Sequence, residues 1–225
     1  MKDKTVLIGM PTYSGMIPAH VVQSILQLVK PCKVAFMVVE RQRIDKSRNS
    51  IAMEALKVGA DYLMFVDDDN PIPPDTLLKF LEDDKDIVTA PILGRVPDKD
   101  GKHHLCVFNS AEKKVDGENL RLYFPVTEFD DGDLHEVDCC GMGCTLIKRR
   151  VLESLYAKYK DYMFEFGDIR FKKPVNINGV EYDRRTMSED CEFSERAVDA
   201  GFEIWVDTRI RPYHLTKIGA VRWGD

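Results

Sequence analysis

Short apolar runs alternate with helix-like segments through the first ninety residues, and this alternation constrains the fold more than any other feature. Four runs, at residues 5–9, 33–40, 62–66 and 87–90, are apolar without the strict alternation of a half-exposed strand. Unbroken apolar strands separated by helices are typical of a mostly parallel sheet covered on both faces. We therefore expect an α/β fold in which all four strands are buried.

The segment at residues 46–58 has the apolar spacing and the terminal glycine that predict a helix. Ile51, Ala55 and Val58 recur at helical spacing and form one apolar stripe. Gly59 follows directly, and a glycine at this place commonly ends a helix. We expect a crossover helix here that packs its stripe on the sheet.

From residue 91 the pattern changes to polar, turn-rich loops between shorter signals, without an internal repeat or a long linker. The second half therefore predicts a smaller mixed region beside the main sheet, within one domain. Its expected elements are strands at 105–108 and 120–126, helices at 151–159 and 188–200, and a final strand at 203–206.

Composition narrows the class of partner and compartment. The chain has 225 residues and a net charge of −6, which argues against nucleic acid because phosphates bind basic surfaces. The charged first residues and the lack of any apolar run near ~18 residues predict no signal and no transmembrane segment. We expect a cytoplasmic protein with free thiols. A peripheral membrane contact through Trp223, Lys217 and Arg222 stays open.

Three consecutive acids, Asp67, Asp68 and Asp69, follow directly on the apolar run at 62–66. Ligands of parallel sheets bind outside the carboxyl ends of the strands. Adjacent carboxylates repel one another, and a cation among them relieves that repulsion. Their hard oxygen ligands suit Mg²⁺ or Mn²⁺. A solvated acidic turn is the alternative, but the position favours a metal site.

A Glu-Asp pair, Glu189 and Asp190, opens the expected helix at residues 188–200. Asp190 shares a helical face with Phe193 and Ala197, so its carboxyl group should be partly desolvated, which suits a general base. The competing interpretation is a helix start, because the helix dipole favours acids there. Thr186 with Glu189 also fits a capping box.

Weaker candidates lie where the other strands end. An aromatic ring, a carboxylate and an arginine would suit a nucleobase, a base N–H and a diphosphate. Tyr13, Glu40 and Arg48 supply these groups. His214 follows the expected last strand and is either a metal ligand or a structural hydrogen-bond donor.

These features, in this order, resemble the family 2 glycosyltransferases and their relatives with the GT-A fold. The resemblance implies one GT-A-like domain over residues 1–225, with a nucleotide-sugar-binding half at 1–90 and an acceptor-binding, catalytic half at 91–225. The stretches that carry it are Ile8-Gly9-Met10-Pro11-Thr12-Tyr13, Ser47-Arg48-Asn49, the acid triplet with Asn70, Gly141-Met142-Gly143-Cys144, and Ser188-Glu189-Asp190.

The resemblance also implies a reaction and a role for each matched residue. Asp190 would deprotonate a hydroxyl acceptor that attacks the sugar of a nucleotide-diphosphate donor, with inversion, and Glu189 would position Asp190 or bind the acceptor. UDP is the favoured nucleotide. Mn²⁺ or Mg²⁺ would be bound by Asp67, Asp69 and His214. Donor contacts would be Pro11, Thr12, Tyr13, Glu40, Arg48, Asn49 and Asp68, and acceptor contacts Gly141, Met142 and Gly143.

Three other functions stay open. A sugar-phosphate nucleotidyltransferase shares the alternating pattern, but it would need arginine and lysine in a loop after the first strand, and residues 9–15 contain neither. Retaining transfer would make Asp190 structural. A non-catalytic module that binds a nucleotide sugar or a glycan would bind without turnover, yet it needs no Glu-Asp pair beside the acid triplet.

Overall fold

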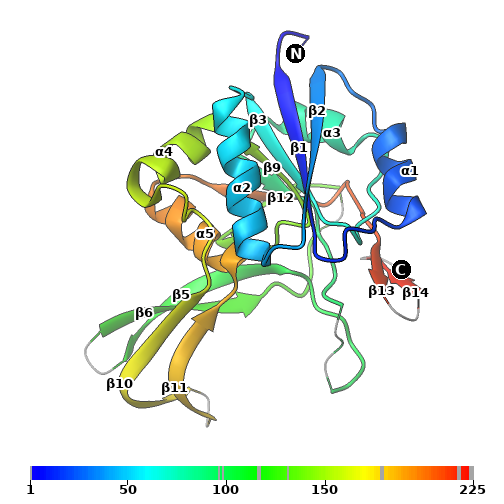
Figure 1. The fold of residues 1–225 in the computed structure, drawn as a ribbon. Coiled ribbons are helices and arrows are strands. Elements are labelled where there is room, and N and C mark those ends of the chain that lie inside the picture. The colour runs from blue at the N-terminus through cyan, green and yellow to red at the C-terminus, as the bar shows by residue number, and fades with distance from the viewer. Residues whose placement is uncertain are drawn as a thin grey trace.

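A seven-stranded sheet forms the centre of the molecule in the computed structural model (Figure 1). The structure describes residues 2–95, 97, 99–115, 118–130, 132–177, 180–216 and 219–222. Across the sheet the strands are β2 (Lys33–Glu40), β1 (Thr5–Thr12), β3 (Tyr62–Val66), β9 (Cys144–Lys148), β4 (Ile87–Thr89), β12 (Ile204–Asp207) and β7 (Leu134–Val137). Only β9 and β7 run against the other five. The predicted α/β fold with a mostly parallel sheet is confirmed.

Helices cover both faces of this sheet, and each face has its own apolar cluster. In the first cluster the ring of Phe164 lies against two others. It stacks on Phe193 with the ring centres 4.2 Å apart, and it meets Phe65 edge-on at 5.5 Å. The first face carries α2 (Ile44–Lys57), α4 (Arg149–Tyr159) and α5 (Glu189–Asp199), and the second carries α1 (Ala19–Gln27) and α3 (Thr76–Asp83).

Helix α2 packs directly on β1. A Cβ atom at Gly9 would lie 2.1 Å from Ile51 Cγ2, so only glycine lets the helix approach this closely. Ile51 and Ala55 are buried as expected, and Gly59 follows the helix with a φ of +70°. Val58 is 55% exposed, which corrects the predicted stripe, because the helix ends at Lys57.

Strand β2 has the predicted bounds but not the predicted burial. Phe36 and Val38 are exposed, and Val39 is the buried member of the strand. The reason is position, since β2 forms one edge of the sheet and has a neighbour only in β1. The apolar run therefore predicted the strand correctly but predicted its burial wrongly.

Helix α5 begins one residue after its cap. Ser188 Oγ accepts a hydrogen bond from the Cys191 backbone N–H, so Ser188 is the cap. Thr186 lies in the preceding strand, and the predicted capping box with Glu189 is wrong. Phe193 and Ala197 are fully buried, which confirms the inward face on which Asp190 lies.

Three small sheets extend the fold beyond the main sheet. The hairpin β10 (Gly167–Ile177) and β11 (Val180–Met187) was not expected, and the last hairpin corrects the prediction that β12 ends the strand series. Figure 1 shows the two longer hairpins projecting past the same end of the sheet. The other strands are β5 (Val107–Val115), β6 (Glu118–Pro125) and β8 (Cys139–Cys140), with β13 (His214–Thr216) and β14 (Gly219–Val221) near the C-terminus.

No helix among the described residues is long and apolar enough to cross a membrane. Of the three residues suggested for a peripheral membrane contact, Trp223 and Lys217 lie outside the described residues. Arg222 places its guanidinium 4.7 Å from the centre of the Tyr213 ring.

Candidate functional site

A cleft of about 530 Å³ opens where β1 and β3 end, between the starts of α2 and α5. It unites most of the residues singled out from the sequence, although they come from four separate segments of the chain. These are Pro11, Thr12, Tyr13, Arg48, Asp67, Asp68, Asp69, Glu189 and Asp190. The predicted edge of the sheet is therefore where the polar groups converge.

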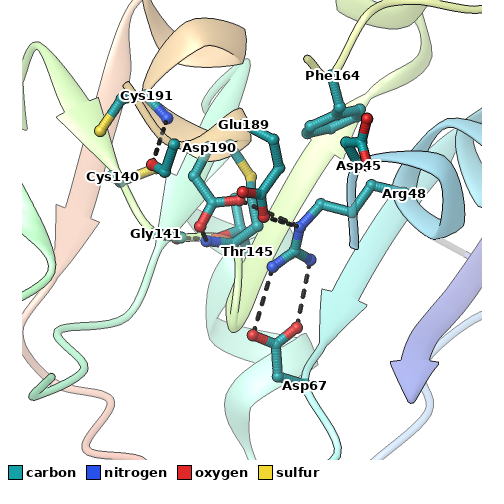
Figure 2. Close-up of polar contacts among 12 residues, drawn as sticks. Asp45, Arg48, Asp67, Cys140, Gly141, Thr145, Phe164, Glu189, Asp190 and Cys191 are labelled. Atoms are coloured by element: carbon teal, nitrogen blue, oxygen red, sulfur yellow. Dashed lines mark hydrogen bonds and ion pairs between the residues drawn. The ribbon is translucent and has the colours of Figure 1, made fainter. Parts of the chain in front are cut away.

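Arg48 lies at the floor of the cleft with three carboxylates around it (Figure 2). Its Nη1 and Nη2 atoms face the two Asp67 oxygens at 3.2 and 3.3 Å. Its Nε atom is 3.2 Å from Glu189 Oε1 and 3.1 Å from Asp190 Oδ1. The Arg48 side chain is only 2% exposed. We call these four residues the Arg48 cluster.

Asp190 is held from two directions. Besides Arg48 at Oδ1, its Oδ2 accepts a hydrogen bond of 3.3 Å from the Met142 backbone N–H. Burial raises the pKa of Asp190 well above the usual aspartate range, Arg48 opposes this shift, and Glu189 and Asp67 add to it. A fixed carboxyl group with a raised pKa on a cleft floor has the properties of a general base or acid.

The three consecutive acids have three different environments. Asp67 faces Arg48. Burial raises the pKa of Asp68, although a hydrogen bond from Thr12 opposes that shift. Asp69 Oδ2 lies 3.1 Å from Arg95 Nη1, and the pKa of Asp69 is lowered because Arg95 and a histidine outweigh the effect of burial. The triplet is thus divided among separate partners.

The histidine beside Asp69 is His214, on β13. Its Nδ1 atom donates to the Leu93 carbonyl oxygen, which turns Nε2 toward Asp69 Oδ2 at 3.4 Å. Burial lowers the pKa of His214, but Asp69 and the Leu93 carbonyl outweigh it, and the net shift is upward. An imidazole nitrogen and a carboxylate oxygen this close fit two ligands of a divalent cation.

The described part of the chain contains no group of three His, Cys, Asp or Glu side chains arranged to bind a metal. Asp67, the other acidic ligand that the resemblance implies, has both oxygens turned to Arg48 instead. The pair that fits a cation is therefore Asp69 with His214.

Two donor-side candidates do not line the cleft. Asn49 binds the main chain of Phe164, donating from Nδ2 to its carbonyl at 2.6 Å and accepting from its N–H at 3.0 Å. Glu40 lies at the end of β2 with its carboxylate beside Gly15, where a Cβ atom would be 2.4 Å from Oε2. Asn49 thus supports the chain around the cleft, through its two hydrogen bonds to Phe164.

The turn at Gly141, Met142 and Gly143 lies behind the cleft acids and does not line the cleft. Met142 is fully buried. A Cβ atom at Gly143 would lie 2.5 Å from Asn70 Oδ1 and 3.3 Å from Asp67 Oδ2. The small residues of this turn let the main chain approach the carboxylates closely.

Five further residues line the cleft without having been assigned a role from the sequence. Two of them are cations with side chains about two-thirds exposed, Arg43 at 64% and Arg95 at 65%. The basic run Arg41-Gln42-Arg43 after β2 was a usable signal, whereas Arg95 lies in a loop that carries none. The full set is Gln42, Arg43, Ile44, Ser47 and Arg95.

Comparison with known proteins places the chain by its fold alone. No family model matches it, and no curated protein matches its sequence. The crystal structure of A197 from STIV is similar with a TM-score of 0.55 and 16% identity, covering 96% of this chain and 86% of that one. CMP:2-keto-3-deoxy-manno-octonic acid synthetase complexed with CTP aligns with a TM-score of 0.42 and 16% identity, covering 91% and 89%. The first likeness shows a shared fold, and the second is too distant to support an inference.

Proposed function

We propose that this chain is a GT-A-like glycosyltransferase that moves a sugar from a nucleotide-diphosphate donor, UDP-linked by preference, to a hydroxyl group, with inversion. The observation that carries the proposal is Asp190, a positioned carboxyl group with a raised pKa in the same cleft as the acid triplet. A general base and an acid-rich donor site in one cleft are what this reaction needs.

In the proposed reaction, Asp190 takes the proton of the acceptor hydroxyl. The hydroxyl oxygen then forms a bond to the anomeric carbon, and the bond from that carbon to the diphosphate oxygen breaks. The bonding electrons leave with the nucleoside diphosphate. Arg48 and the Met142 N–H hold the two Asp190 oxygens, so the base needs little reorganisation to act.

The donor side of the cleft offers groups that suit a nucleotide. Tyr13 is 81% exposed at the cleft lip and presents a ring to a nucleobase. Arg43 and Arg95 place cations where the diphosphate would lie. Asp69 and His214 would hold Mn²⁺ or Mg²⁺, which when bound stabilises the negative charge of the departing diphosphate.

The acceptor side is assigned to the second half of the chain. The hairpins β5–β6 and β10–β11 project past the end of the sheet at which α5 begins (Figure 1). In this proposal, residues 1–90 bind the nucleotide and residues 91–225 supply the base and the acceptor surface. Gly141 and Gly143 act by allowing close approach to the acids rather than by contacting the acceptor.

The proposal is tested by the melting temperature of the protein with UDP, GDP, CDP or ADP, each with Mn²⁺, Mg²⁺ or a chelator. A ligand at about 100 times its Kd adds about 2.7 kcal/mol to stability. We expect a rise with one diphosphate that disappears with chelator and in Asp69→Ala. No rise with any of these nucleotides would contradict the proposal.

A further inference from the structure

Arg48 directs its polar contacts to the protein itself: Nε donates a hydrogen bond to Glu189 Oε1, Nη2 donates one to Asp67 Oδ2, and Nη1 forms an ion pair with Asp67. Its Nη atoms face both Asp67 oxygens, and its Nε atom is shared between Glu189 and Asp190. With 2% of the side chain exposed, the guanidinium has no face to offer a diphosphate. An arginine that binds phosphate must present its N–H groups to the ligand.

The contacts of Arg48 join three elements that are distant in sequence. Arg48 belongs to α2, Asp67 follows β3, and Glu189 and Asp190 open α5. Arg48 and Glu189 are 141 positions apart in the chain. The guanidinium also lies 5.2 Å from the centre of the Phe65 ring, which packs under it. Arg48 is thus the direct link between the donor-side acids and the base.

We propose that Arg48 is a positioning residue that fixes the Asp190 carboxylate relative to the acid triplet, and that it does not contact the donor. The inference rests on the proposed function, because it names what holds the proposed base in place. A planar fork can bind Asp67 with two nitrogens and Asp190 with a third, whereas a lysine ammonium cannot do both.

Three carboxylates around one guanidinium make the neutral replacement of Arg48 a poor test, because the variant would leave buried acids without a cation and would lose stability. Arg48→Lys keeps the charge and removes the fork. The matched control is Arg209→Lys, since Arg209 also binds two buried carboxylates, those of Asp207 and Asp83, and does not line the cleft. We call these three residues the Arg209 cluster.

Steady-state kinetics separate positioning from donor contact. We expect Arg48→Lys to lose about 10²-fold in kcat, as a base displaced by about 1 Å does, while KM for the donor stays within about twofold. The acid limb of its kcat–pH profile should move to higher pH, because the lysine ammonium no longer contacts Asp190 as Arg48 Nε does at 3.1 Å. Arg209→Lys should keep the wild-type kcat. A parallel loss of nucleotide affinity in Arg48→Lys, or an unchanged kcat, would overturn the proposal.

A second measurement tests the link without turnover. The free energies of unfolding of Arg48→Lys, Asp190→Asn and the double variant form a cycle. If Arg48 holds Asp190, the two single effects are not additive, whereas additive effects overturn the proposal. A wild-type protein that transfers no sugar but shows this coupling would refute the proposed function and leave the link in place.

Discussion

The Arg48 cluster and the Arg209 cluster use the same chemistry in different surroundings. Arg209 binds Asp207 at 2.8 and 2.9 Å and also pairs with Asp83, and both carboxylates are almost fully buried. Its own side chain is 36% exposed, against 2% for Arg48. One cluster fastens α3 to the segment after β12, and the other forms the floor of a cleft.

The two clusters differ in exposure and in place, because only the Arg48 cluster lines a cleft. A buried carboxylate is tolerable where a cation matches it, and Arg209 meets two acids from the protein edge, where water still reaches its guanidinium. Arg48 is fully enclosed and faces three acids. Each cluster holds an acid with a raised pKa, Asp190 in one and Asp83 in the other, but only Asp190 lines a cleft in which a raised pKa can serve a base.

Asp190→Asn should have the largest effect of the substitutions in the two clusters. Turnover should fall by about 10²–10⁴-fold, because the amide cannot accept the acceptor proton, while nucleotide affinity stays at the wild-type value. Kinetics of donor consumption and nucleotide melting shifts measure the two effects. Asp207→Asn is the matched variant in the Arg209 cluster and should keep wild-type turnover. Wild-type turnover in Asp190→Asn would remove it as the base.

Arg209→Met should act on stability alone. It leaves Asp207 and Asp83 buried without their cation, and breaking such a pair costs about 3–5 kcal/mol. Urea denaturation measures the loss, and a nucleotide titration of the folded fraction should be unchanged. A variant that kept its stability but lost nucleotide affinity would show that the cluster serves the cleft.

Asp69→Ala should lower the chelator-sensitive part of nucleotide affinity by about tenfold or more, or about 1.4 kcal/mol, because His214 alone holds a cation poorly. Isothermal titration with and without chelator separates that part. Asp75→Ala is the control, since Asp75 is 47% exposed and its ion pair with Lys79 is a contact of small energy. Equal affinity in the presence of Mn²⁺ for Asp69→Ala and wild type would place the cation elsewhere.

The last prediction concerns the pH dependence of stability. Burial raises the pKa of Asp83 from 3.8 to about 6, and the neighbouring Asp207 adds to it while Arg209 opposes it. A raised carboxyl pKa in the folded state means that its contribution to stability is full below 3.8 and is lost as the pH rises through about 6. Asp83→Asn should remove this slope from urea midpoints measured between pH 4 and about 7. An unchanged slope would assign it to other groups.

The sequence predicted the core of the fold because its signals are local. Residues 62–66 form β3 with those bounds, and the helical spacing of Asp190, Phe193 and Ala197 correctly placed the carboxylate on an inward face. Strand order is not local, so the edge position and exposure of β2 were missed. The polar hairpin β10–β11 lacks the apolar pattern on which strand prediction depends.

The candidate site, like the fold, was predictable only where its signals are local. The positions of the strand ends predicted where the cleft acids lie, because parallel strands bring their carboxyl ends to one edge of the sheet. The partners of Arg48 were not predictable, since Glu189 is 141 positions away and no spacing rule connects them. Arg95 was missed for a related reason, as a loop cation has no periodicity and only the folded chain places it 3.1 Å from Asp69.

The most direct test of inverting sugar transfer by Asp190 uses NMR. It follows the anomeric protons of a panel of UDP-hexoses and GDP-hexoses with the wild-type protein and Mn²⁺. Water or an added hydroxyl compound serves as acceptor, and Asp190→Asn serves as the control. We expect a nucleoside diphosphate and a sugar of inverted anomeric configuration, formed by the wild type alone. Release of a nucleoside monophosphate with a sugar phosphate, or equal product from Asp190→Asn, would contradict this expectation.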